Sequence, residues 1–99
     1  MSRPFYSEYV RHCMRFYSRN LHITRFKTLV DDMNWRACHE VMLQLPEKTR
    51  DILVSVYGGY DTLADEVYNT SRKYSMNQNI IWDMMKGFER AVAEHRGLV

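Results

Sequence analysis

The chain has 99 residues, enough for one small domain with one modest hydrophobic core. Apolar residues make up 45% of it and charged residues 26%, with four glycines and two prolines, a composition typical of a folded protein. No apolar run approaches the roughly 20 residues that a transmembrane helix needs, and the N-terminal residues lack the apolar region of a signal peptide. We therefore expect a cytoplasmic protein with no membrane partner.

The net charge of +2 is spread unevenly along the chain. Residues 1–27 contain six basic residues and one acidic residue, whereas residues 28–99 contain eight basic and eleven acidic residues. A basic N-terminal segment suggests a polyanion or an acidic protein face as partner. Arginines on the solvent side of a surface helix explain the same charges without any partner. The candidate partner surface is made of Arg11, Arg15, Arg19 and Trp82.

Five helical segments and no convincing strand are predicted, which places the chain in the all-α class as a small five-helix bundle. The expected segments are 4–20, 25–45, 47–58, 61–74 and 77–95. Residues 1–45 hold two N-terminal helices, the first of them basic, and residues 46–99 hold the remaining part of a single domain. No internal repeat or low-complexity tract interrupts this order.

Several helix ends are marked by particular residues. Pro46 ends the second helix, because proline disfavours helical geometry in the residue before it. Asp61 is a plausible N-cap of the fourth helix, and Gly97 ends the fifth, with Leu98 placed to fold back as in a Schellman motif. The apolar stripe expected to face inward on the second helix comprises Phe26, Leu29, Val30, Met33, Ala37, Val41 and Leu45.

The segment "SRKYSMNQNIIWDMM", residues 71–85, has the residue spacing of a helix-turn-helix. That motif needs a small residue where its helices cross, a small residue opening the turn, and apolar residues that face the partner helix. The six residues in this order and spacing are Ser71, Tyr74, Ser75, Met76, Ile81 and Met84. A C-terminal helix-turn-helix is therefore expected.

Two residues are candidates to cap the last helix. Either Asn77 caps it, or Ser75 does so with Gln78 as its capping-box partner, and the residue pattern favours neither.

The segment "LPEKTRDIL", residues 45–53, resembles the opening of region 4 of sigma-seventy family transcription factors. The resemblance is carried by Leu45, Pro46, Glu47, Arg50, Ile52 and Leu53, and it extends loosely to the C-terminus. The chain is also similar to small sigma-like regulators of phages and integrative elements. The resemblance implies a DNA-binding transcription regulator that acts on double-stranded DNA without catalysis, with RNA polymerase as a candidate protein partner.

In this interpretation the last helix enters the major groove. Asn and Gln bond bidentately to adenine, Asp accepts a bond from cytosine, and Lys reaches guanine. The predicted base contacts are Gln78, Asn79, Asp83 and Lys86, and the predicted phosphate contacts are Arg72, Lys73 and Arg90. Asp83 lies in the middle of this face and Glu89 near its edge, and a carboxylate there is repelled by phosphate. We therefore expect weak DNA binding, or binding only beside a partner.

A second function class is a helical protein-interaction module. An inhibitor of the anti-CRISPR kind, which binds and blocks a host protein or nucleoprotein complex, fits the aromatic and arginine-rich residues 5–19. A homodimer through the apolar N-terminal helix is plausible as well.

No catalytic, metal or cofactor motif is recognised, so we expect neither an enzyme nor a metalloprotein. Adjacent Cys and His residues, as at His12 and Cys13, point about 100° apart on a helix and do not close easily on one ion. Cys13 and Cys38 are expected to be reduced core residues.

Overall fold

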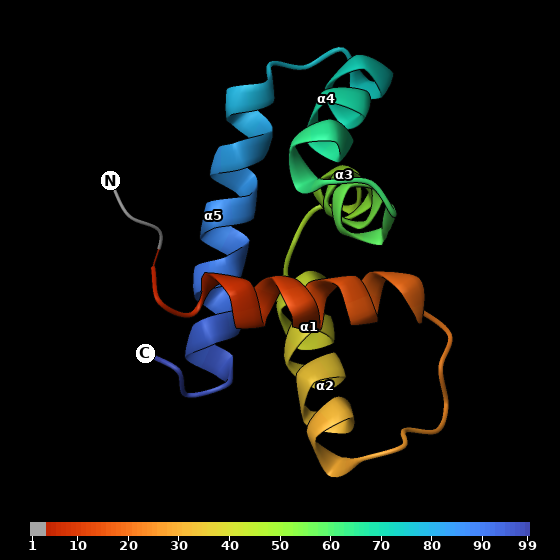
Figure 1. Ribbon diagram of the computed structural model, residues 1–99, viewed down its shortest axis with the longest axis vertical. Coiled ribbons are helices and arrows are strands. Elements are labelled where there is room, and N and C mark those ends of the chain that lie inside the picture. The colour runs from red at the N-terminus through yellow and green to blue at the C-terminus, as the bar shows by residue number, and fades with distance from the viewer. Residues whose placement is uncertain (1–3) are drawn as a thin grey trace.

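The computed structural model describes residues 4–99, which form five α-helices and no strand (Figure 1). The helices are α1 (Ser7–Arg19), α2 (Leu29–Leu43), α3 (Glu47–Gly58), α4 (Leu63–Tyr74) and α5 (Gln78–His95). The predicted all-α class and its five helices are confirmed over this range. Arg3, counted above among the basic N-terminal residues, lies outside it.

Two helices begin later than predicted because threonines cap them. The Oγ1 of Thr28 accepts a hydrogen bond from the Asp31 N–H at 3.1 Å, so α2 begins at Leu29 and not at residue 25. Thr62, rather than Asp61, caps α4 in the same way. A threonine hydroxyl can satisfy one of the free N–H groups of the first turn, and this fixes the helix start.

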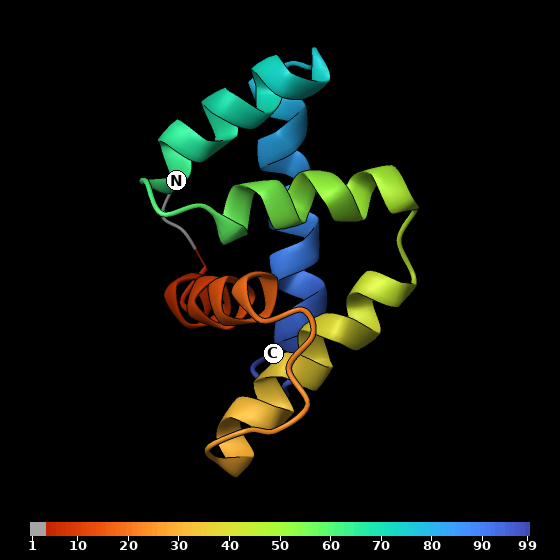
Figure 2. The same ribbon diagram turned by 90° about the vertical axis from the view of Figure 1, so that its right-hand side faces the viewer.

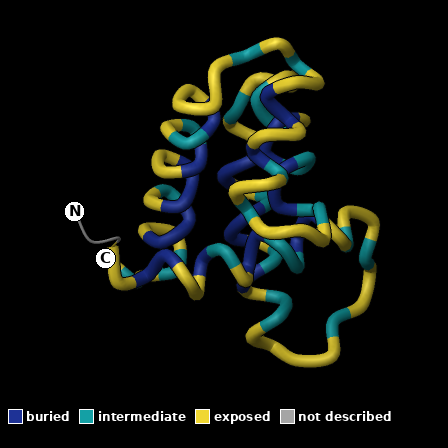
Figure 3. Tube along the Cα trace, turned by 45° about the horizontal axis from the view of Figure 1, so that its top comes forward, coloured by how far each residue is buried: buried dark blue, intermediate teal, exposed yellow. Residues whose placement is uncertain are grey.

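The helices cross around α5. Both α1 and α3 pack against α5 and against each other, α2 packs against α1 and α5, and α4 lies on α3 and α5 (Figures 1 and 2). The α4–α5 connection lies at one end of the molecule and α2 extends toward the other (Figure 1). Buried positions follow the inner sides of the helices, and the α4–α5 connection is mostly exposed (Figure 3). No helix within residues 4–99 is both long and apolar enough to cross a membrane.

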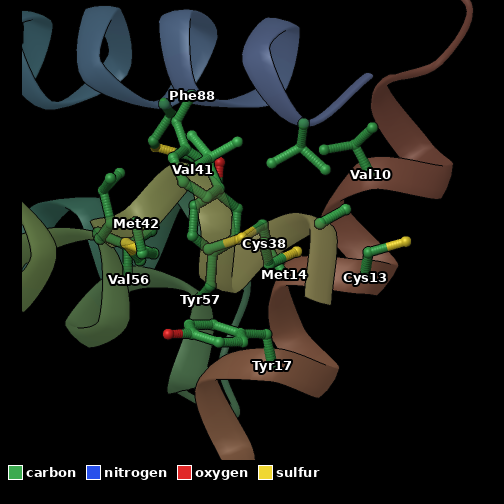
Figure 4. Close-up of a cluster of buried hydrophobic side chains, with 14 of the residues drawn as sticks. Val10, Cys13, Met14, Tyr17, Cys38, Val41, Met42, Val56, Tyr57 and Phe88 are labelled. Atoms are coloured by element: carbon green, nitrogen blue, oxygen red, sulfur yellow. The ribbon is translucent and has the colours of Figure 1, made fainter. Parts of the chain in front are cut away.

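The core is formed by the apolar sides of α1, α2, α3 and α5 together with Val67 of α4, and Tyr57 is among the residues of the cluster in Figure 4. Cys13 and Cys38 are both buried and free, which confirms them as core residues. Burial raises the pKa of the Cys13 thiol to about 11, and it raises the pKa of Cys38 further. Both thiols therefore stay protonated at neutral pH and are poor nucleophiles.

The first turns of α2 contradict the predicted apolar stripe. Leu29, Val30 and Met33 are 73%, 51% and 44% exposed, because α2 packs through the side that carries Ala37 and Cys38. The helix was expected to extend its inward stripe to these residues, yet its first turns project beyond the core.

An aromatic cluster holds the connection between α1 and α2. The Trp35 Nε1–H donates to the Asn20 carbonyl oxygen at 3.0 Å, and the Trp35 ring stacks on His39 with centroids 4.6 Å apart. Phe26 packs on the same indole, at a centroid distance of 5.9 Å. Phe26 was predicted as a helical residue but instead closes this connection over Trp35.

Two isoleucines provide a matched test of the core. Ile52 is 1% exposed and Ile80 is 48% exposed. Ile52→Ala is expected to lower the free energy of unfolding by about 2–4 kcal/mol, because it leaves a cavity. Ile80→Ala is expected to change it by less than about 1 kcal/mol. Urea denaturation followed by circular dichroism measures both, and equal losses would contradict this core.

Candidate nucleic-acid interface

The connection between α4 and α5 is a tight turn of residues 75–77. Ser75 has φ 52°, the one positive φ of a non-glycine residue within residues 4–99. Its N–H donates to the Arg72 carbonyl at 3.4 Å, and the Met76 N–H donates to the Ser71 carbonyl at 2.9 Å. These bonds make a Schellman-type helix end, in which the left-handed residue reverses the chain.

The C-terminus of α5 ends in the same way, but with a glycine. Gly97 has φ 71°, its N–H donates to the Glu94 carbonyl at 3.1 Å, and the Leu98 N–H donates to the Ala93 carbonyl at 2.8 Å. The Schellman motif predicted at Gly97 and Leu98 is confirmed. Ser75 occupies the corresponding position of α4, where a side chain makes the left-handed conformation costly.

Asn77 is the N-cap of α5. Its Oδ1 accepts a hydrogen bond from the Asn79 N–H at 2.8 Å. Of the two caps left open by the sequence, the structure has Asn77, while Ser75 ends α4. The side chains of Gln78 and Asn79 are exposed and are not used as caps.

The six residues of the helix-turn-helix pattern differ in burial. Ser71 and Ile81 are buried, and the Ser71 hydroxyl donates to the Tyr68 carbonyl at 2.7 Å. Tyr74, Met76 and Met84 are half-buried and pack against the core, and Ser75 is exposed in the turn.

The predicted base-contact residues all lie on the solvent side of α5. The exposed set is Gln78, Asn79, Asp83, Lys86 and Arg90. Arg90 also pairs with Glu94 one turn further along, with its Nε 3.1 Å from the Glu94 carboxylate. The spacing of these residues, three or four apart from Asn79 onward, gives one continuous polar stripe.

Arg72 and Lys73 are exposed at the C-terminal end of α4, close in sequence to the turn. An Arg72 N–H donates to the Tyr68 hydroxyl at 3.0 Å, and the Lys73 ammonium lies 5.4 Å from the Tyr74 ring centre. Together with Lys86 and Arg90 they place four basic side chains on the α4–turn–α5 segment, on which Asp83 is an exposed acidic residue. Trp82 is half-buried and packs against the core.

Glu89 was predicted to lie near the edge of the polar stripe, and this prediction is wrong. It is 4% exposed, and its Oε2 accepts hydrogen bonds from the Arg11 Nε–H at 3.0 Å and from the Tyr57 hydroxyl at 2.5 Å. The carboxylate therefore joins α1, α3 and α5 inside the protein. Because Glu89 is buried, the surface on which DNA binding was predicted has one acidic charge fewer than the sequence suggested.

The Tyr57 phenol remains a hydrogen-bond donor in this network. Burial, and secondly the adjacent Glu89 carboxylate, raise the pKa of Tyr57 above its ordinary value. A neutral phenol and a guanidinium thus satisfy the same carboxylate oxygen, which a buried charge requires.

The three N-terminal arginines proposed as a partner surface have different environments. Arg11 is 16% exposed and bonded to Glu89. Arg15 is half-buried and lines a hollow of roughly 430 Å³ with Glu8, His12 and Thr62. An Arg19 N–H donates to the Gly59 carbonyl at 2.6 Å. Arg11 is therefore a structural residue, and Arg19 is tied to the α3–α4 connection.

The Arg11–Glu89 pair is the feature that reasoning from the sequence missed. The sequence does indicate that Glu89 is buried, because Glu89 lies at helical spacing from Met85 and Val92, which are both buried on α5. A carboxylate on an apolar stripe calls for a buried cation, but 78 residues separate Glu89 from Arg11. Only the packing of α1 on α5 brings them together.

No protein-family model, curated protein or solved structure matches the chain. Within residues 4–99, no three His, Cys, Asp or Glu side chains are arranged to hold a metal ion.

The turn geometry predicts the effect of a glycine at position 75. Ser75→Gly is expected to raise the free energy of unfolding by about 0.5–1 kcal/mol, because the left-handed cost of serine exceeds the entropy that glycine adds to the unfolded chain. Asn69→Gly, at an exposed position inside α4, should lower it by up to about 0.5 kcal/mol. Urea denaturation of both variants measures the difference. A destabilised Ser75→Gly protein would rule out this turn.

The buried network predicts strong coupling between Arg11 and Glu89. Arg11→Met and Glu89→Gln are each expected to lower the free energy of unfolding by about 2–4 kcal/mol, because each leaves an unpaired buried partner. The double variant should lose less than the sum, with a coupling of about 1–3 kcal/mol.

The exposed pair on α5 is the matched control for this cycle. The side chains of Arg90 and Glu94 are 64% and 58% exposed, so their coupling is expected to stay below about 0.5 kcal/mol. Equal coupling in the two cycles would show that the buried network does not hold α1 on α5.

Proposed function

We propose that the protein is a DNA-binding transcription regulator of the sigma region 4-like type, in which α4 and α5 act as a helix-turn-helix. The observation that carries the proposal is the Ser75 turn followed by the Asn77-capped start of α5. This arrangement leaves the side-chain amides of Gln78 and Asn79 exposed in the first turn of α5, whose opposite side is buried. The N-terminal turns of a recognition helix are the ones that enter the major groove.

The side chains on α5 match the chemistry of base edges. The amides of Gln78 and Asn79 have the donor and acceptor pair that bonds adenine, and Lys86 donates to guanine. Asp83 accepts a hydrogen bond from the amino group of cytosine, so its charge restricts the sequences that bind. Arg72, Lys73 and Arg90 are proposed to bond phosphates and to set the position of the helix on the duplex.

The electrostatic part of the affinity is proposed to be small. Arg11 and Arg19 bond groups of the protein itself, so they offer less to a polyanion than their number in the sequence suggests. Three phosphate contacts give a slope of log affinity on log salt of roughly −3. Such a protein would act on promoters beside a partner such as RNA polymerase, contributing contacts rather than catalysis.

The exposed apolar residues of α2 favour the second candidate, a protein-interaction module or inhibitor of a host complex. Leu29, Val30 and Met33 lie close together on the first turns of α2 and are exposed. Neighbouring exposed apolar side chains are typical of protein contact surfaces. In this alternative α5 is a capped surface helix, and Asp83 has no phosphate nearby.

Fluorescence anisotropy of a labelled duplex DNA of random sequence tests the proposal. Binding is expected at low salt and should weaken as salt rises, because it depends on phosphate contacts. Lys86→Ala combined with Arg90→Ala is expected to abolish binding, since it removes both basic side chains in the middle of α5.

The matched control removes two positive charges elsewhere. Arg25→Ala combined with Lys48→Ala changes the net charge equally at exposed positions outside α4 and α5. The control should bind at most about threefold more weakly than the unmodified protein. Binding that survives in the Lys86 and Arg90 variant, or that is lost equally in the control, would overturn the assignment of α5.

A further inference from the structure

The exposed side of α2 carries a regular stripe of five residues. They are Leu29, Met33, Arg36, Glu40 and Leu43, all of which are exposed. Their spacing alternates between four and three residues, which keeps all five on one narrow side of the helix. This is the spacing of the contact positions in a coiled coil, in which the same side of one helix faces a partner helix.

The last four residues of the stripe, from Met33 to Leu43, are self-complementary in order. An arginine and a glutamate occupy the middle, and apolar residues flank them on both sides. In two antiparallel copies of α2 related by a two-fold axis near residue 38, Arg36 of each copy faces Glu40 of the other. The same register sets Met33 of each copy against Leu43 of the other. A two-fold interface requires such reciprocal pairs.

We propose that this stripe is the contact surface between two copies of the chain. The order of the charges favours a second copy over an unrelated protein as the partner. In one register, Arg36 and Glu40 of one copy face the opposite charges of the other, and Met33 faces Leu43. A parallel pairing would set Arg36 against Arg36 and Glu40 against Glu40, so the charges select the antiparallel arrangement.

The surface beside the stripe is shaped to receive a side chain. A hollow of roughly 330 Å³ between α2 and the end of α5 is lined by Met33, Ala37 and Glu40 on one side and by His95 and Arg96 on the other. In the proposed register the partner's Leu43 lies beside Met33, at the apolar part of this hollow. Insertion of a side chain between four residues of the facing helix is the usual packing of such helices.

Arg36 is available for this contact. Its Nε pairs with the Asp32 carboxylate at 2.5 Å within α2, and its side chain is 71% exposed. An exposed pair of this kind contributes little to stability, and the remaining guanidinium N–H groups are free to bond a second carboxylate.

The N-terminal helix, by contrast, does not offer the apolar surface that the sequence analysis assigned to a homodimer. The apolar side of α1, including Val10, Met14 and Tyr17, is buried in the core. The helix α2 extends toward the opposite end of the molecule from the α4–α5 turn (Figure 1). The dimer thus leaves the proposed DNA-contact residues uncovered and does not depend on that function.

Sedimentation equilibrium over about a hundredfold range of protein concentration tests the dimer. The unmodified chain is expected to approach twice its monomer mass of 11.9 kDa at high concentration. Arg36→Glu and Glu40→Arg, each alone, are expected to raise the dissociation constant by about tenfold or more, because each places like charges opposite one another twice. Lys86→Glu, exposed on α5, is the control and should not weaken the dimer.

A mixture of the two single variants is the decisive sample. One chain then carries two acidic residues and the other two basic residues at positions 36 and 40, so the mixture should dimerise where neither variant does alone. Circular dichroism spectra of both variants check that α2 is intact. A chain that stays monomeric throughout, single variants that dimerise normally, or a mixture that does not associate would each overturn the proposal.

Discussion

The buried Glu89 carboxylate is the interaction on which the arrangement of α5 depends. One oxygen accepts hydrogen bonds from Arg11 of α1 and from Tyr57 of α3, so three helices meet at one charge. A carboxylate inside a protein is stable only when such partners surround it. Because apolar packing alone tolerates small rotations of a helix, while two directed bonds to one oxygen do not, this network fixes the rotation of α5 about its axis.

Fixing that rotation also decides what α5 presents to solvent. With Ile81, Met85 and Glu89 turned inward, Asn79 and Lys86 are turned outward. The Ser75 turn and the Asn77 cap set where the outward side begins. The buried acid and the exposed polar stripe are therefore two consequences of one helix orientation, and the exposed surface is less acidic than the sequence suggests.

Much of the fold could be predicted from the sequence, because helix periodicity and end signals are local. Gly97 marked a helix end that the structure contains, and the turn at Ser75 followed from residue spacing. The second helix ends at Leu43, earlier than the predicted residue 45, and Pro46 is the N-cap of α3. Asp61 was predicted as the cap of α4, but its neighbour Thr62 caps the helix, since both residue types can cap and only the backbone decides. The exposure of Leu29 was also missed, because periodicity shows that a helix has an apolar side but not where its packing ends.

The candidate site was predictable only in part. The exposure of the Gln78 and Asn79 side chains could be predicted, because they lie opposite the apolar stripe of α5. The Arg11–Glu89 pair could not, because it joins residues far apart in sequence. No local pattern distinguishes an arginine that faces solvent from one that reaches a buried acid on another helix. For the same reason the charge of the N-terminal segment overstated the basic surface available to a partner.

The proposal that the outward side of α5 contacts DNA is tested by mapping backbone amide chemical shifts of an isotope-labelled sample during addition of a short DNA duplex at low salt. We expect the largest changes in residues 72–86, around the Ser75 turn and the start of α5, with small changes elsewhere. Changes confined to α2, or no changes at all, would contradict the proposal.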